Sequence, residues 1–156
     1  MARLVVVEGP DKVGKETQSK LLEQRLSDMG LRVIRVEPTK EGHPKGKKAI
    51  YGMLNSGEAK RKPNKFQFVQ FINRMYFQFF KLPKLLQNND VVILDRWALS
   101  GYVYGKCEGI NPVLNRLMYW FARRPDRCLV LIGHSYKRDM ADDSYERDTD
   151  LQERVK

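Results

Sequence analysis

The segment RLVVVEGPDKVGKETQ, residues 3–18, decides the fold. A short apolar run rich in β-branched valine leads into a turn that contains Gly9 and Gly14, and a helical pattern follows at once. Four residues separate the two glycines and Lys15 comes next, which is the spacing of a loop whose backbone N–H groups surround phosphate oxygens. The lysine ammonium in such a loop reaches the β- and γ-phosphates. The order of strand, loop and helix therefore predicts a nucleotide-binding α/β domain.

The rest of the chain continues the alternation of strands and helices. Further apolar segments predict strands at residues 31–36, 91–95 and 128–132. Helical patterns cover about residues 14–29, 47–55, 64–88 and 112–123. Uninterrupted apolar strands that alternate with helices are typical of a parallel sheet covered on both faces. We therefore expect a single α/β domain over residues 1–156, with the three-layer P-loop NTPase fold and four visible strands.

The composition limits the possible partners. The 156 residues include 29 Lys+Arg and 19 Asp+Glu, a net charge of +10, which favours a polyanionic ligand. Residues 40–65 contain eight basic and two acidic side chains, which form either a solvated loop face or a phosphate-attracting rim. No apolar run approaches the roughly 20 residues of a membrane span, and the N-terminal one is too short for a secretory signal. We expect a cytoplasmic protein that binds neither membrane nor nucleic acid, with Cys107 and Cys128 reduced.

Residues 64–88 predict one long and unusually aromatic helix. Its polar side chains fall on a single stripe at helical spacing, namely Gln67, Gln70, Arg74, Gln78 and Lys81. The wide apolar remainder favours two buried contacts, one with the domain core and one with a partner subunit. Pro83 is expected to kink or shorten the end of this helix.

Two carboxylates near the loop are candidates for a Mg²⁺ site. Glu16 stands where a Ser or Thr hydroxyl normally ligates the metal, and it either ligates Mg²⁺ itself or repels the triphosphate. Asp95 ends the strand at residues 91–95, and the carboxyl end of a central strand lies beside the phosphate loop. The next residue, Arg96, can clamp a transferring phosphoryl group. Together these groups favour phosphoryl transfer over simple binding.

Five segments resemble motifs of the thymidylate kinases. EGPDKVGKETQ is similar to that family's E-G-x-D-x-x-G-K-[ST]-T-Q loop apart from Glu16, and LDRWALSGYVYG is similar to its D-R-Y-x-x-S-G-x-A-Y segment. VEPTK, FINR and SYERDTDLQERV resemble three further motifs, so the similarity covers nearly the whole chain. The resemblance implies an enzyme that uses ATP and Mg²⁺, passes the γ-phosphoryl group to dTMP to give dTDP, and forms a homodimer.

The resemblance also implies which residues form the site. On the ATP side they are Gly9, Asp11, Lys12, Val13, Gly14, Lys15, Glu16 and Thr17, with Lys137 and Arg138 in a lid at about residues 133–147. On the acceptor side they are Asp11, Pro38, Lys40, Gln70, Phe71, Arg74, Arg96, Ser100, Gly101, Tyr104 and Tyr145. The catalytic residues are Lys12, Lys15, Asp95 and Arg96, and the metal ligands are Glu16 and Asp95. By the same resemblance, Asp11 would hold the 3′-hydroxyl of the acceptor, Arg96 its phosphate with help from Lys40, and Arg74 the thymine edge.

Three departures from the family pattern bear on these roles. The aromatic residue that stacks on the base is replaced by Gln70, which shares the polar stripe with Arg74 and either faces the base with its amide or is solvated, whereas Phe71 belongs to the apolar face. Ser144 replaces an arginine of the lid. The chain stops at Lys156, before a fifth strand with which the family continues. That end fits a minimal enzyme, a sheet edge completed by another subunit, or an incomplete product.

Three other functions stay open from the sequence. One is phosphorylation of a different acceptor, such as dUMP, a modified pyrimidine or a deoxynucleoside. Deoxynucleoside kinases typically carry an E-R-S type motif where this chain has Asp95-Arg96-Trp97, which counts against them. A second is nucleotide binding with weakened catalysis, which Glu16 and Ser144 would explain. The third is nucleic-acid binding through the positive charge, although no nucleic-acid motif accompanies it.

Overall fold

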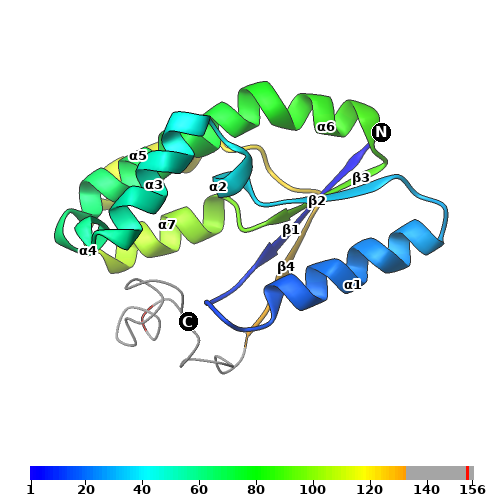
Figure 1. Ribbon diagram of the computed structural model, residues 1–156, viewed down its shortest axis with the longest axis horizontal. Helices are drawn as coiled ribbons and strands as arrows, with labels where there is room; N and C mark the ends of the chain where they lie inside the picture. The colour runs from blue at the N-terminus through cyan, green and yellow to red at the C-terminus, as the bar shows by residue number, and fades with distance from the viewer. Residues whose placement is uncertain (133–153, 155–156) are drawn as a thin grey trace.

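A parallel four-stranded sheet organises the fold. The computed structural model describes residues 1–132 and residue 154. The strands are β1 (Arg3–Glu8), β2 (Val33–Val36), β3 (Val91–Asp95) and β4 (Arg127–Val130), in the order β2-β3-β1-β4 (Figure 1). Every neighbouring pair is parallel, so the carboxyl ends of all four strands lie at the same end of the sheet. The predicted parallel sheet is confirmed.

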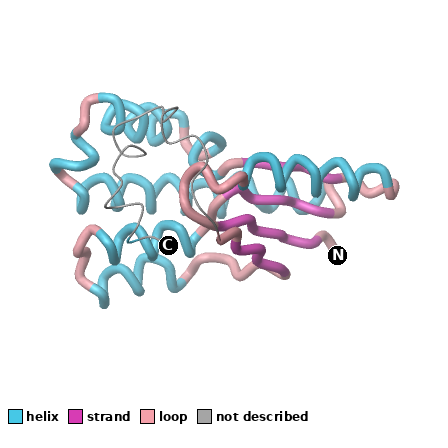
Figure 2. The backbone as a smooth tube through the Cα atoms, turned by 90° about the horizontal axis from the view of Figure 1, so that it is seen from below, coloured by secondary structure: helices cyan, strands magenta, loops and turns pink. Residues whose placement is uncertain are grey.

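Helices lie on both sides of this sheet and extend beyond it. They are α1 (Lys15–Asp28), α2 (Pro38–Glu41), α3 (Pro44–Asn55), α4 (Glu58–Arg61), α5 (Pro63–Tyr76), the π-helical turn η1 (Phe77–Lys81), α6 (Leu82–Asn88), α7 (Ala98–Cys107) and α8 (Pro112–Trp120). Figure 1 shows α1 below the strands and α6 above them. Seen at right angles, the strands gather at one end of the molecule and most helices at the other (Figure 2). No helix in this described part is both long and apolar enough to cross a membrane.

The two faces of the sheet are buried against different helices. One face packs in a cluster of Leu4, Val6, Phe77, Leu82, Val92, Leu94 and Trp97. The other face packs in a cluster of Val7, Val91 and Ile93, against which Leu22 and Leu26 of α1 lie. A third cluster joins α3, α4, α5 and α7 through Ile50, Met53, Ala59, Phe66 and Tyr104. The predicted three layers are therefore present around β1 and β3.

The long aromatic helix continues through Pro83 instead of ending at it. The helix runs to Asn88, but the five residues Phe77–Lys81 form a π-helical turn directly before α6. Pro83 then lies in the first turn of α6, where the lack of a backbone N–H group costs little in helical hydrogen bonding. Of the two expectations for Pro83, the shortening of the helix is wrong, because α6 reaches Asn88, and the kink stays a prediction.

Strand β4 is exposed, contrary to its apolar composition. The sequence predicts a buried strand over residues 128–132, but all four residues of β4 are exposed. Its position explains this, because among the described residues β4 is an edge strand that pairs with β1 alone. Leu129, Val130 and Ile132 consequently present apolar area to solvent within the described part of the chain. Apolar composition therefore predicts that a strand forms here, but it does not predict whether other elements bury that strand.

Most of the polar stripe of the long helix faces inward, whereas part of its apolar face is exposed. Gln67, Arg74 and Gln78 are buried, and each has a hydrogen-bond partner on α7, α8 or the segments that follow them. Phe68 and Ile72 of α5 are more than half exposed, as are Phe79 and Phe80. Phe66 and Phe77 of the same helix lie in the core clusters, so the expected contact with the domain core is confirmed for them, whereas the expected contact of the four exposed residues with a partner subunit stays a prediction. Helical spacing separated the two faces correctly but did not decide which one lies inside.

Candidate functional site

The loop between β1 and α1 has the backbone of an anion site. Gly9 and Gly14 have φ angles of 144° and 91°, and Lys12 adopts a left-handed φ of 59°. A Cβ atom on Gly9 would lie 2.5 Å from the carbonyl oxygen of Leu131, so only glycine fits there. Gly14 is the N-cap of α1 and offers no side-chain cap to the first turn. The backbone N–H groups in the first turn of α1 are therefore suited to bind a negatively charged ligand.

Lys15 lies buried at the start of α1 and folds over the loop. Its Nζ atom donates a hydrogen bond to the carbonyl oxygen of Pro10. Burial, and then the positive charge of Arg96, lower the pKa of Lys15 from 10.5 to about 8. A phosphate beside Nζ would favour the charged ammonium and raise this pKa again.

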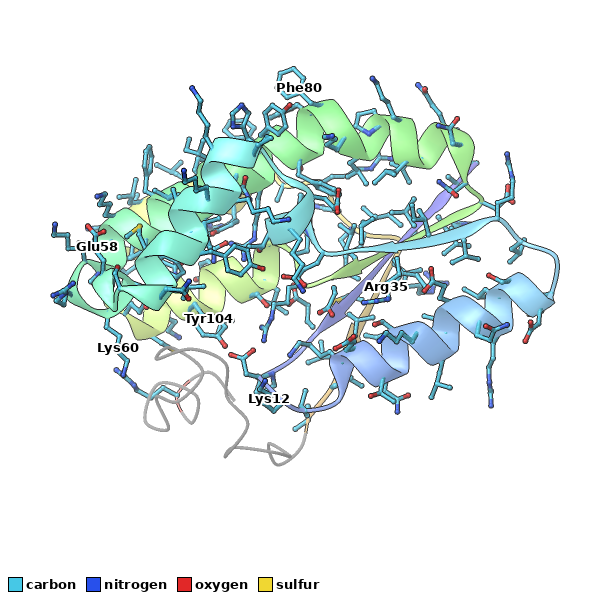
Figure 3. The ribbon with its side chains drawn as sticks, viewed as in Figure 1. Lys12, Arg35, Glu58, Lys60, Phe80 and Tyr104 are labelled. Atoms are coloured by element: carbon cyan, nitrogen blue, oxygen red, sulfur yellow. The ribbon has the colours of Figure 1, made fainter. Side chains whose placement is uncertain are left out.

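Five residues at the carboxyl ends of β1 and β3 form a continuous set of hydrogen bonds, called the strand-end network below: Glu8, Asp11, Arg96, Ser100 and Tyr104. Arg96 forms an ion pair with Asp11 through Nη2. Its Nη1 atom lies 3.1 Å from the carbonyl oxygen of Gly9 and 3.2 Å from Oγ of Ser100. The Tyr104 hydroxyl donates to Asp11 over 2.7 Å. Figure 3 labels Tyr104 on α7 and Lys12 on the loop that carries Asp11.

Arg96 is held in an unusual backbone conformation. Its φ angle is 66°, in the left-handed region that residues with a Cβ rarely adopt. Burial acts to lower the pKa of its guanidinium, while the charges of Asp11, Tyr104, Glu8 and Asp95 act together to raise it, and the net direction is upward. The guanidinium therefore stays charged, and its position is set by the surrounding residues.

Glu8 is a member of the strand-end network to which the sequence pattern assigned no role. Its side chain is only 2% exposed. Oε1 accepts hydrogen bonds from the backbone N–H groups of Trp97, at 2.9 Å, and Ser100, at 3.3 Å. The Ser100 hydroxyl donates to Oε2. The available signal was a carboxylate at the last position of an apolar strand, directly before Gly9.

A second group of side chains, called the Arg74 group below, joins α5, α7 and α8. Arg74 of α5 donates from Nη1 to the hydroxyl of Tyr119 on α8 over 3.3 Å. The rings of Phe71 and Tyr119 meet edge to face at 5.9 Å. A Cβ atom on Gly101 would lie 2.1 Å from the Tyr119 hydroxyl and 2.7 Å from Nη1 of Arg74, so glycine leaves room for this contact. Tyr119 is another residue that the sequence pattern did not single out.

The predicted acceptor residues on α2 and α5 are also neighbours. Pro38 is buried at the start of α2. The Thr39 hydroxyl lies 3.5 Å from Oε1 of Gln70, and Asn73 donates to the carbonyl oxygen of Thr39 over 3.1 Å. Lys40 is exposed and forms an ion pair with Glu37, which raises the pKa of Lys40. Gln70 therefore lies beside α2, one turn before Arg74 on the same inward face.

The two carboxylates of the predicted metal site have different surroundings. Asp95 is half-buried and pairs in register with Val7, next to the phosphate loop. Its charge acts to raise the pKa of both Lys15 and Arg96. Glu16 is 67% exposed and forms an ion pair with Lys20 over 2.6 Å, which lowers the pKa of Glu16. Within residues 1–132 and 154, no three His, Cys, Asp or Glu side chains lie close enough to hold a metal ion.

The other predicted site residues divide between the loop and a part of the chain without described structure. Lys12 and Val13 lie in the loop, and Thr17 is exposed in the first turn of α1. Lys137, Arg138, Ser144 and Tyr145, with the proposed lid at 133–147, lie outside the described residues. The site as described therefore consists of the phosphate loop, the strand-end network and the Arg74 group.

Three comparisons with known proteins each find similarity to thymidylate kinases. The family model described as thymidylate kinase matches residues 7–155. A probable thymidylate kinase of Methanococcus vannielii is 28% identical over 137 residues, which cover 84% of this chain and 61% of the relative. The chain thus spans about three fifths of that curated relative's length. The solved structure of thymidylate kinase from Candida albicans superposes with a TM-score of 0.77 at 22% identity, covering 99% of this chain and 74% of that one. This last likeness concerns the fold.

Proposed function

The chain belongs to the thymidylate kinase family, whose model spans nearly all of it, and on this basis we propose that it transfers the γ-phosphoryl group of ATP to dTMP, giving dTDP. The main support for the proposal is that Arg96 contacts the phosphate loop. Its Nη1 atom lies 3.1 Å from the carbonyl oxygen of Gly9. A donor site and an acceptor-phosphate site then share one end of the sheet. Phosphoryl transfer needs this arrangement, because two phosphates must be aligned in line.

On the donor side, the phosphates of ATP bind to the loop and the start of α1. The N–H groups after Gly14 and the ammonium of Lys15 neutralise the β- and γ-phosphates. Lys12, held with a left-handed backbone at the loop tip, supplies a further positive charge to the group in transfer. These contacts hold the donor in place and stabilise the charge that develops on the transferred group.

On the acceptor side, Arg96 binds the phosphate of dTMP, and Lys40 assists. In the described part of the chain, the bonds to Gly9, Ser100 and Asp11 use three of the five N–H groups of Arg96, which leaves donors for a phosphate. Asp11 accepts a hydrogen bond from the sugar hydroxyl, beside the Tyr104 hydroxyl that already donates to it. The acceptor is thereby oriented with its phosphate toward the loop.

The residues present fit Mg²⁺ at the strand end. Enzymes that transfer phosphoryl groups hold Mg²⁺ through one or two carboxylates and the substrate phosphates. Asp95 is the better placed of the two candidates, because it is half-buried beside the loop, whereas Glu16 is exposed and paired with Lys20. When bound, the ion would neutralise charge on the phosphates. Asp95 would hold it there together with its water shell.

The base is recognised at the Arg74 group. Arg74 presents its guanidinium to the thymine edge, with Tyr119 as its neighbour on α8. Gln70 lies one turn away and offers an amide in place of an aromatic face. Because this exchange replaces stacking with hydrogen bonding, another pyrimidine deoxynucleotide such as dUMP is the alternative acceptor. The exposed, paired carboxylate of Glu16 favours a second alternative, in which the chain binds nucleotides with weakened catalysis.

A second copy of the chain is the proposed partner of the exposed faces of α5 and α8. Their apolar side chains, called the apolar surface below, are Phe68, Ile72, Val113, Leu114, Leu117, Trp120 and Phe121, each more than half exposed. The two helices are neighbours, since Phe71 of α5 contacts Tyr119 of α8. Exposed apolar side chains on neighbouring helices favour an interface. We therefore propose a homodimer in the cytoplasm, with free nucleotides and not nucleic acid or membrane as its ligands.

The decisive experiment measures ADP release with ATP and Mg²⁺ across a panel of acceptors. The panel contains dTMP, dUMP, dCMP, dGMP and the parent nucleosides. Turnover with dTMP as the best acceptor is the expected result. Turnover only with nucleosides would contradict the proposal, and ATP binding without turnover on any acceptor would favour the binding-only alternative.

A further inference from the structure

Helix α7, which follows Arg96 directly, begins without a cap of its own. The first N–H groups of a helix have no partner within it, and a polar side chain at the N-cap usually accepts from one of them. The N-cap of α7 is Trp97, which makes no such bond. Its ring is buried against Phe77 at 6.0 Å, and its Nε1 atom donates to the carbonyl oxygen of Arg123. The side chain of Trp97 is therefore committed to the core and cannot cap the helix.

Glu8 of β1 supplies the missing cap from elsewhere in the chain. Its Oε1 atom accepts from the N–H groups of Trp97 and Ser100, which are the N-cap and N3 positions of α7. Within a single helix, a capping box satisfies these same two N–H groups with two local side chains. Here one carboxylate does both from a distance of 89 residues along the sequence. The start of α7 is thus fixed to the end of β1.

The same carboxylate controls the surroundings of the Arg96 guanidinium. Ser100 donates from Oγ to Oε2 of Glu8 and accepts from Nη1 of Arg96. Donation to Glu8 fixes the hydroxyl hydrogen, so that a lone pair of Oγ faces Arg96. The backbone of Arg96 lies between two anchors, its own N–H bonded to the carbonyl oxygen of Val7 and the next N–H bonded to Glu8. Together these bonds hold the left-handed conformation of Arg96.

We propose that Glu8 is a positioning residue, whose buried carboxylate caps α7 from outside the helix and thereby sets the Arg96 guanidinium in the orientation that binds the acceptor phosphate. The proposal rests on the function proposed above. Glu8 itself is too buried to touch the substrate. Its effect therefore falls on the acceptor phosphate and leaves the sugar and base contacts unchanged.

The test compares the affinities of dTMP and thymidine, which differ only in the phosphate, in the wild type and in Glu8→Gln. Glutamine keeps the size of the side chain but loses the negative charge and one acceptor toward Ser100. We expect dTMP to bind roughly tenfold more weakly, because that is the effect of losing one hydrogen bond to a charged group. Thymidine should bind with unchanged affinity. In steady-state assays, KM for dTMP should rise while KM for ATP stays constant. Calorimetric titration gives both affinities directly.

Two further variants serve as a matched control and as a substitute for Glu8→Gln. Glu108→Gln makes the same change at the other end of α7, where Glu108 accepts from Gln67, and should leave the ratio of dTMP to thymidine affinity unaltered. If Glu8→Gln does not fold, Ser100→Ala decides in its place, because it removes the link to Arg96 and keeps the backbone cap. An equal loss for dTMP and thymidine would overturn the positioning role alone. A wild type with no preference for dTMP over thymidine would overturn the proposed function together with it.

Discussion

The strand-end network and the apolar surface show two opposite ways of placing side chains. In the network, the charged groups are largely buried and each contacts another member, as Arg96 contacts Asp11 and Ser100. On the apolar surface, large side chains such as Leu117 and Trp120 are exposed within the described residues. Buried charge is tolerated only when it is paired, whereas exposed apolar area gains free energy when something covers it. The network is therefore organised before any ligand binds, and the apolar surface is suited to a partner.

Lys15→Ala gives the largest expected effect and tests the network side of this comparison. Removal of the ammonium should lower turnover about 10³-fold, because one preorganised contact to developing charge is lost. The thermal midpoint should not fall, since a buried ammonium with a lowered pKa stabilises the fold little. ADP release and thermal denaturation measure the two effects. Activity within tenfold of the wild type would remove Lys15 from the phosphate site.

Arg96→Met should destabilise the fold, in addition to abolishing turnover. The change leaves Asp11 and Glu8 without the nearby positive charge, and breaking a largely buried pair costs about 3 kcal/mol in the free energy of unfolding. Urea denaturation measures this loss. Arg32→Met is the matched control, because Arg32 and Asp90 form an exposed ion pair beside the other end of β3. Equal losses in the two variants would show that the network is not preorganised.

Leu117→Lys tests the apolar surface. A charge placed among Val113, Trp120 and their neighbours should raise the dimer dissociation constant about 100-fold, as loss of a central apolar contact does. Sedimentation or light scattering across a concentration series measures it. Arg116→Gln, an exposed change on the same helix, should leave the dimer intact. A wild type that stays monomeric at high concentration would contradict the homodimer.

The pKa of Lys15 predicts opposite effects of alkaline pH on binding and on stability. ATP affinity should fall by roughly tenfold per pH unit above about 8, because the ligand needs the charged ammonium. The free energy of unfolding of the ligand-free protein should gain a contribution between pH 8 and 10.5, since the unfolded chain then holds the extra proton. That contribution is lost as the pH falls through 8. Titration calorimetry and urea denaturation test both signs, and Lys15→Ala should show neither.

Glu16→Ser should have the smallest effect. The carboxylate of Glu16 is exposed and bound to Lys20, and surface ion pairs of this kind contribute about 0–1 kcal/mol. We therefore expect turnover at saturating Mg²⁺ to be retained or raised. A Mg²⁺ titration of ADP release gives the apparent metal affinity at the same time. Collapse of activity at saturating Mg²⁺ would show that Glu16 ligates the metal and is not merely tolerated.

The features that could be predicted from the sequence are the local ones. The phosphate loop follows from the spacing of Gly9, Gly14 and Lys15, and β1 and β3 follow from their apolar composition. The position of Arg96 beside that loop follows from the parallel pairing of these two strands. Each of these depends on a few adjacent residues or on one rule of sheet topology.

Other features depend on contacts that no local pattern contains. Periodicity separated the faces of α5, but only the partners of Arg74 and Gln67 on other helices determine that the polar face lies inside. The cap that Glu8 provides joins two residues 89 positions apart. The apolar residues of β4 predicted burial, but the order of the described strands places β4 at an edge of the sheet. Such contacts are set by tertiary packing, which a single sequence does not display.

The π-helical turn at Phe77–Lys81 changes what the long helix can do. A π turn holds one more residue than an α turn, so it rotates everything after it by about 100° relative to an uninterrupted α-helix. Before the turn, α5 directs Arg74 toward Tyr119 of α8; after it, α6 directs Leu82 into the core against the sheet. Deletion of one residue between Phe77 and Lys81 would restore regular α-helical winding. Arg74 and Leu82 could then no longer both keep their present directions. The helix is thus continuous in length but built from two independently oriented halves.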